Sequence, residues 1–148
     1  MTWELHKFDE LTAAELYERL KLRVDVFVVE QNCPYPELDG LDQESAHLSY
    51  TKDGKVLAYA RLVPGGLKYD IPSIGRVIVR QEARGRGLAK ELMHKCIDFI
   101  FAEWQPEAIQ LQGQVYLKDF YQSFGFEPIS AEYDEDGIPH LDMKLEKI

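Results

Sequence analysis

Apolar residues recur at helical spacing early in the chain. The stripe consists of Leu16, Leu20, Val24, Phe27 and Val28. Residues three and four apart share one face of a helix, so this spacing predicts an amphipathic helix that buries the stripe. Thr12 precedes the stripe, and Glu15 follows Thr12 by three residues, which is the spacing of a capping box. We predict that the helix starts at Thr12 and reaches Glu30.

A second amphipathic helix follows a turn with two glycines. The turn is Gly85-Arg86-Gly87, and the stripe after it comprises Leu88, Leu92, Cys96 and Phe99, with Met93, Ile97 and Ile100 beside it. The segment from Ile74 to Val79 is predicted to be a strand. The chain therefore passes from a strand through a glycine turn into a helix.

Strand signals surround these helices. Trp3 and Leu5 indicate a short first strand. Asp53-Gly54 is a hairpin turn signal, and the segments 47–50 and 56–63 on either side of it are predicted to pair as antiparallel strands.

The rest of the chain is predicted to complete a mixed sheet. Its elements are a loop at 31–45, a strand at 109–112, a short helix at 118–124, and two strands at 128–133 and 141–145 that pair across 134–137. The order strand, helix, three strands, helix, strand, helix, two strands predicts an α/β (α+β) fold with helices on the faces of the sheet. No repeat or linker divides the chain, so residues 1–148 are expected to form one domain.

Composition narrows the function classes. The length of 148 residues suits one core, and 45% hydrophobic with 29% charged residues excludes a mostly disordered chain. The 17 Lys and Arg against 26 Asp and Glu give a formal net charge of -9. An acidic surface repels nucleic acid and anionic lipid. We therefore expect no nucleic-acid partner and no membrane partner.

The cysteines and the targeting signals give further expectations. Cys33 and Cys96 show no CxxC spacing, which disfavours a metal site and a disulfide framework. The N-terminal residues lack an apolar signal core, and the apolar stretch at 97–102 is too short to span a membrane. We expect a cytoplasmic protein with free thiols and no metal. Cys96 is expected in the core, and Cys33 as a small packed residue whose reactivity is left open.

Positive charge is concentrated around the glycine turn. Residues 76–95 carry six basic and two acidic side chains, a net charge of +4, which leaves -13 for the remaining residues. The first amides of a helix have no intrahelical acceptor, and glycines let a phosphate approach the backbone. We predict an anion cradle at this turn; a tight turn followed by a solvated helix face is the alternative. The segment lacks the Gly-Lys-Ser/Thr of a Walker loop and the third glycine of a dinucleotide fingerprint.

The turn resembles motif A of the Gcn5-related N-acetyltransferases, the GNAT family. The pattern Arg/Gln-x-x-Gly-x-Gly/Ala is matched by Arg84, Gly87 and Ala89, and the predicted element order is similar to that of the family. The resemblance implies the GNAT fold, with a mostly antiparallel sheet, and acetyl-CoA as cosubstrate. It also implies that Ile78 and Val79 line the pantetheine arm and that the pyrophosphate is held by Arg84, Gly85, Arg86, Gly87, Leu88 and Ala89.

A second segment, from Lys118 to Phe126, resembles motif B of the same family. The resemblance implies that Tyr121 is the acid that protonates the leaving CoA thiolate. A phenol, with an ordinary pKa of about 10, stays protonated at neutral pH and can do this. The alternative is that Tyr121 belongs to a core cluster of aromatic side chains.

The attack needs a neutral amine, so a base or a water chain must take a proton from the acceptor. Glu30, at the end of the first helix, and His47, at the start of a strand, are the candidate bases, because both are expected beside the acceptor cleft in this fold. A solvated helix-end carboxylate is the alternative for Glu30. Hydrogen bonding within the sheet is the alternative for His47.

The segment from Arg23 to Tyr35, with Asp39, Asp42 and His47 after it, resembles the ElaA-type branch of the family, and the resemblance covers essentially the whole chain. This branch implies no particular acceptor. The acid-rich stretch from Glu30 to Glu44 favours a cationic amine, with a solvated acidic loop as the alternative.

These observations favour an enzyme that transfers an acetyl group from acetyl-CoA to a primary amine of a small molecule or peptide, by direct attack in a ternary complex. Two alternatives remain open. One is a protein that binds or senses CoA without catalysis, and the other is a transferase that uses a longer acyl-CoA. The identity of the acceptor and a homodimeric state are left open.

Overall fold

The computed structural model describes residues 2–147. The strands are β1 (Thr2–Lys7), β2 (Ala46–Lys52), β3 (Lys55–Val63), β4 (Ser73–Val79), β5 (Ala108–Gln114), β6 (Glu127–Pro128), β7 (Tyr133–Glu135) and β8 (Ile138–Glu146). The α-helices are α1 (Ala13–Val24), α2 (Leu88–Phe99) and α3 (Lys118–Gln122). Short 3-10 turns cover Phe8–Glu10, Asp42–Glu44, Gln81–Ala83 and Val115–Leu117.

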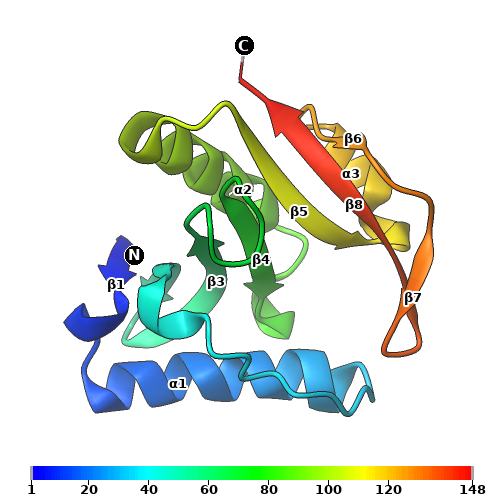
Figure 1. The fold of residues 1–148 in the computed structure, drawn as a ribbon. Helices are drawn as coiled ribbons and strands as arrows, with labels where there is room; N and C mark the ends of the chain where they lie inside the picture. Colours follow the sequence, from blue (N-terminus) through cyan, green and yellow to red (C-terminus); the bar gives the residue numbers. More distant parts are fainter. Residues whose placement is uncertain (1, 148) are drawn as a thin grey trace.

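All the strands belong to one mixed sheet. Their order is β1-β2-β3-β4-β5-β8-β6, and β7 pairs with β8. Every pairing is antiparallel except that of β4 with β5, which is parallel. The predicted fold class, a mixed and mostly antiparallel sheet flanked by helices, is confirmed (Figure 1).

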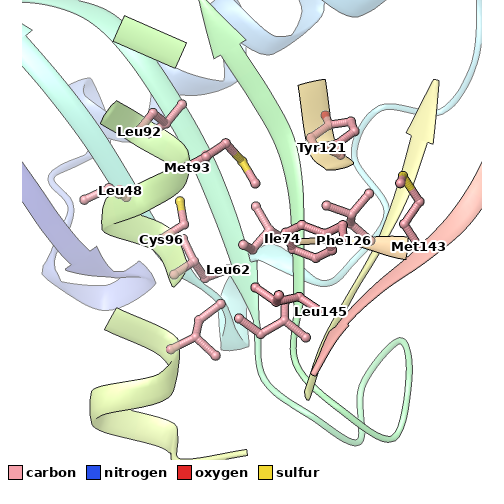
Figure 2. Packing of buried hydrophobic residues seen from close by; sticks show 14 of the residues in the cluster. Leu48, Leu62, Ile74, Leu92, Met93, Cys96, Tyr121, Phe126, Met143 and Leu145 are labelled. Carbon is pink, nitrogen blue, oxygen red and sulfur yellow. The ribbon is translucent and has the colours of Figure 1, made fainter. Parts of the chain in front are cut away.

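The helices cover opposite faces of the sheet because β3 alternates between them. Ala58, Ala60 and Leu62 face the core that α2 and α3 complete, whereas Tyr59 packs with Leu22 of α1. Figure 2 shows the side chains of the larger core, which are contributed by α2, α3 and the central strands. The fully buried Cys96 lies in this core, as predicted. The sheet is thus covered on both sides.

The first helical segment begins after Thr12 and reaches Glu30, as its sequence predicts, but only its first part is α-helical. The Thr12 hydroxyl accepts from the Glu15 amide, and the Glu15 carboxylate accepts from the Thr12 amide, so the capping box is present. The helix then continues beyond Val24 as a π-helical segment, Asp25–Glu30. This wider turn carries the chain to Glu30 at the rim of the cleft described below.

The last hairpin differs from its predicted form. We expected an uninterrupted strand at 128–133 and a turn at 134–137. Instead β6 and β7 are separate, and Glu135 pairs with Ile138 across a two-residue turn. Asp136 and Gly137 both have positive φ, as the tight turns that suit β-hairpins require, so the turn is shorter than predicted. Within residues 2–147 no helix is long and apolar enough to cross a membrane.

Candidate active site

A cleft opens where β4 and β5 diverge in the middle of the sheet. The two strands share a single paired position, Ser73 with Gln110, and separate beyond it (Figure 1). A bulge on β4 bends the strand at this point, because Arg76 and Val77 lie opposite the single residue Ala60 of β3. Arg76 has a φ of 52°, a conformation that non-glycine residues rarely adopt. The resulting cleft has a volume of about 750 Å³.

The glycine turn at the start of α2, next to the cleft residues Arg84 and Ala89, has a run of unpaired backbone amides. Gly85 and Gly87 have φ of 82° and 76°, which a residue without a Cβ adopts at no steric cost. Helical hydrogen bonding starts only at Glu91, whose amide donates to the Gly87 carbonyl. The amides of residues 85–90 therefore have no backbone acceptor within the part of the chain that the structure describes. Donors of this kind at a helix N-terminus bind an anion.

The residues predicted to hold the cofactor lie around this feature. Ile78, Val79, Arg84 and Ala89 border the cleft. Gly85, Arg86 and Gly87 are exposed in the turn itself. Leu88 differs, because its side chain packs against the core and leaves only its amide for a ligand.

The Arg84 side chain is engaged by the protein. Its Nη1 and Nη2 atoms donate to the two carboxylate oxygens of Glu30 at 2.9 and 3.2 Å, and its Nε donates to the Val79 carbonyl at 2.8 Å. Arg84 therefore joins the end of the first helical segment to the glycine turn. Arg84 is expected to help hold the pyrophosphate, and in the structure its guanidinium nitrogens donate to Glu30 and to Val79. Arg86, by contrast, makes no salt bridge within residues 2–147.

Tyr121 lies at the other side of the cleft, on α3. Its ring packs so closely on β5 that a Cβ at Gly113 would come within 3.0 Å of it. Figure 2 shows the ring at the edge of the core. The phenol borders the cleft. Burial raises the pKa of Tyr121 to about 12, so the phenol holds its proton at neutral pH.

His47 does not lie beside the cleft, and this expectation is wrong. It is on β2, with β3 between it and β4, and its side chain is 1% exposed. Its Nδ1 atom is 2.6 Å from the Tyr59 hydroxyl and its Nε2 atom is 3.0 Å from the Asp42 carbonyl oxygen. Both ring nitrogens therefore have buried partners, one in β3 and one in the 3-10 turn at Asp42, an arrangement close to its alternative of hydrogen bonding within the sheet. A sequence position at the start of a strand does not reveal which face the side chain occupies.

Most carboxylates of the acid-rich stretch are paired with arginines. Three of its carboxylates pair with three arginines of α1, β3 and β4, and the group consists of Arg23, Arg61, Arg76, Glu37, Asp39 and Asp42. We call this group the arginine–carboxylate network. Its formal charges cancel, so it supplies no net attraction for a cation. A cationic acceptor stays a prediction; among the acids of the stretch, Glu30 pairs with Arg84 and Glu44 lies outside the network.

The network fixes the loop at 31–45, which lines one side of the cleft. Arg23 donates to Glu37 at 2.6 Å and to Asp42 at 2.7 Å, and all three are buried. Arg61 binds both oxygens of Asp39, at 2.7 and 2.8 Å. A buried charge left without its partner costs about 3–5 kcal/mol. The loop is therefore held in one position by charges that depend on each other.

Three residues that shape the cleft were not singled out from the sequence. Arg76 donates to Glu37 at 2.7 Å and ties the β4 bulge to the network. Lys68 and Gln112 also border the cleft. A lone glycine inside a strand, such as Gly113, indicates that another group approaches the backbone closely. No local sequence pattern indicates the positions of Arg76, Lys68 and Gln112.

The two cysteines are free, and the described residues offer no group that would hold a metal ion. Cys33 is buried and its Sγ is 3.2 Å from the Asp136 carbonyl, so it packs between the loop and the last hairpin. Both cysteines are free. Across residues 2–147 there is no group of three or more side chains suited to holding a metal ion.

Acid is expected to lower the free energy of unfolding in two steps. Burial lowers the pKa of His47 below 6.5, so the unfolded chain gains a proton that the folded chain does not, and stability falls as the pH drops through that value. Burial would raise the pKa of Asp42, but its hydrogen bonds and the charge of Arg23 hold it below 3.8. Further stability is therefore lost below about pH 4.

Urea unfolding across a pH series measures both steps. His47→Gln is expected to remove the upper step and to keep the lower one. The matched control is His94→Gln, because His94 is exposed on α2, and it is expected to keep both steps. An upper step that persists in His47→Gln would contradict the assignment.

Comparisons with known proteins agree with this geometry. The family described as "Acetyltransferase (GNAT) domain" matches residues 12–147. The Escherichia coli protein ElaA is 40% identical over 148 residues, which cover 99% of this chain and 97% of that protein. The crystal structure of Escherichia coli ElaA has a TM-score of 0.92 and 39% identity, covering 98% of this chain and 99% of that one.

A second solved structure is equally similar. It is described as an acyl-CoA N-acyltransferase from Pseudomonas aeruginosa, with a TM-score of 0.93, 39% identity, and coverage of 97% of this chain and 98% of that one. The family match over most of the chain, the identity to ElaA and the shared fold lead to one conclusion. The chain belongs to the GNAT family and is a member of its ElaA-type branch.

Proposed function

We propose that the protein transfers an acetyl group from acetyl-CoA to a primary amine of a small molecule or peptide, by direct attack in a ternary complex. Its GNAT acyltransferase fold supports acyl transfer from CoA. The observation that carries the proposal is that Arg84 and Ala89, which flank the glycine turn and its free amides, border the same cleft as Tyr121. A phosphate-bearing donor and a proton donor for its leaving group thus fit in the same space.

The reaction follows from these positions. The diphosphate of CoA binds the amides of residues 85–90, and the pantetheine arm lies along β4 at Ile78 and Val79. A neutral acceptor amine attacks the thioester carbonyl carbon, and a backbone amide of β4 stabilises the developing oxyanion. The tetrahedral intermediate collapses, the carbon–sulfur bond breaks, and Tyr121 protonates the CoA thiolate. The proton released by the amine passes to water in the open cleft.

Release of free thiol from acetyl-CoA in the presence of a panel of primary amines tests the proposal directly. Turnover with at least one amine supports it. Tight binding of acetyl-CoA without turnover on any acceptor would favour the CoA-sensing alternative. Faster turnover with longer acyl-CoA thioesters than with acetyl-CoA would assign a different donor to the same cleft.

Tyr121→Phe is expected to lower kcat by about 10²-fold or more, because it removes the proton donor for the thiolate. The affinity for acetyl-CoA, measured by calorimetry, should stay within about twofold of wild type since the ring and its packing on Gly113 are retained. Tyr17→Phe, at an exposed position on α1, is the control and should leave kcat unchanged. Full turnover by Tyr121→Phe at all pH values would remove Tyr121 as the acid.

Gly87→Ala is expected to weaken acetyl-CoA binding by about tenfold or more, because a Cβ disfavours the left-handed backbone that aims the amides of the turn. Gly54→Ala is the matched control: Gly54 has nearly the same φ, 75°, in the β2–β3 turn away from the cleft. Both variants should lose similar stability in urea unfolding. If both retained wild-type affinity, the amide cradle would not be the phosphate site.

Glu30 is a candidate base whose geometry favours a positioning role, since both of its oxygens accept from Arg84. We propose that Glu30 braces the glycine turn while water takes the proton. Glu30→Gln is then expected to raise KM for acetyl-CoA, to change kcat by less than about tenfold, and to keep the shape of the kcat pH profile. Loss of the basic rise in that profile, with KM unchanged, would instead identify Glu30 as the base.

A further inference from the structure

The acceptor half of the cleft contains a cation without a carboxylate partner. Lys68 lies in the loop between β3 and β4 and borders the cleft. Its Nζ atom contacts Gln112 Oε1 at 3.5 Å, a long hydrogen bond, and lies 5.5 Å from the centre of the Tyr69 ring. Within residues 2–147 no carboxylate oxygen comes within 4.0 Å of it. The ammonium is therefore available to a ligand.

The neighbouring cations are in a different situation. Arg61 binds Asp39 and Asp42, and Arg76 binds Glu37 and Asp39, so both guanidinium groups are already neutralised inside the arginine–carboxylate network. Asp39, the network carboxylate that borders the cleft, has its oxygens occupied by these arginines. A ligand that enters the cleft therefore meets Lys68 as the uncompensated positive charge in this region.

Uncompensated negative charge lies on the far side of Gln112. The Gln112 side chain donates through Nε2 to Glu135 at 2.9 Å, while its Oε1 faces Lys68. Glu135 and its neighbour Asp136 belong to the last hairpin, border the cleft, and make no salt bridge in the described chain. The acceptor half thus has a positive side on the β3–β4 loop and a negative side on the β7–β8 hairpin.

The surroundings of Lys68 favour an anion there. Partial desolvation lowers the pKa of Lys68, an exposed residue at the rim of the cleft, and the charges of Arg76 and Arg61 lower it further, against smaller opposing effects of Asp39 and Glu135. A bound anion offsets both effects, because it pairs with the ammonium and balances the nearby guanidinium groups. A second cation at the same place, such as the distal amine of a polyamine, would be repelled.

We propose that Lys68 binds a carboxylate of the acceptor, so that the acceptor belongs to the amino-acid class, in which one small molecule carries both an amine and a carboxylate. The acceptor ammonium faces the Glu135 side before it loses its proton and attacks. This proposal rests on the proposed transferase function and adds the substrate class.

Matched acceptors test the proposal. Thiol release from acetyl-CoA is measured with standard amino acids, with their carboxamides and with the corresponding decarboxylated amines. Wild-type kcat/KM is expected to be about tenfold or more higher for an acid than for its amide, since a charge-assisted hydrogen bond is lost in the amide. Equal values for acid, amide and amine, or turnover of the amines alone, would overturn the proposal.

Variants of Lys68 separate recognition from folding. Lys68→Gln is expected to raise KM for the acid by about tenfold, with kcat and the values for the amide unchanged, whereas Lys68→Arg keeps most of the preference. Lys52→Gln, an exposed lysine at the end of β2, is the control and should behave as wild type. An equal loss for acid and amide in Lys68→Gln would show a merely structural role and would overturn the proposal.

A binding measurement distinguishes failure of this inference from failure of the proposed function. If no acceptor releases thiol although acetyl-CoA binds, the transferase proposal fails, and amino-acid binding to the CoA complex is then followed by ligand-observed NMR. Binding that is present in wild type and lost in Lys68→Gln supports the carboxylate site. Absence of amino-acid binding to the wild-type complex overturns it.

Discussion

The bulge at Arg76 and Val77 is the constraint on which the site depends. It turns β4 away from β5 after one shared pair, and the cleft exists because the two strands cannot resume pairing. Arg76 keeps its uncommon backbone conformation while its side chain is bound to Glu37 and Asp39. The bulge, the loop at 31–45 and the start of the cleft are therefore held by one set of charges, and none of them can move alone without leaving a buried charge unpaired.

The two halves of the cleft use different chemistry. The proposed donor half is built from backbone, because glycines at positive φ and the free amides at the start of α2 suit an anion whatever the side chains are. The acceptor half is built from side chains of distant segments, with Lys68 and Gln112 beside the paired acids. This division suits a family in which one donor serves many acceptors. The protein side chains on the acceptor side of the cleft can change without disturbing the backbone amides on the donor side.

The sequence predicted well what local patterns determine. Helix stripes, the capping box at Thr12 and the glycine turn depend on neighbours a few residues apart, so α1, α2 and the cradle could be predicted. The partners of Asp39 and Asp42 could not, because Arg61 lies on another strand and no spacing links them. The same limitation made His47 a candidate base: its strand could be predicted, but its contact with Tyr59 across the sheet could not. The tight turn at Asp136 was missed because the strand before it is interrupted.

The single shared pair between β4 and β5 has a further consequence for the sheet itself. Although both strands are central in the order, each has an inner edge whose amides and carbonyls lack a neighbouring strand beyond Ser73. Two half-sheets are thus joined mainly by the apolar side chains of the core rather than by backbone hydrogen bonds. A ligand with amide groups of its own can take the position of the absent strand. The proposed donor, whose pantetheine arm carries two amide groups, would in that case complete the secondary structure of the protein as well as supply the acetyl group.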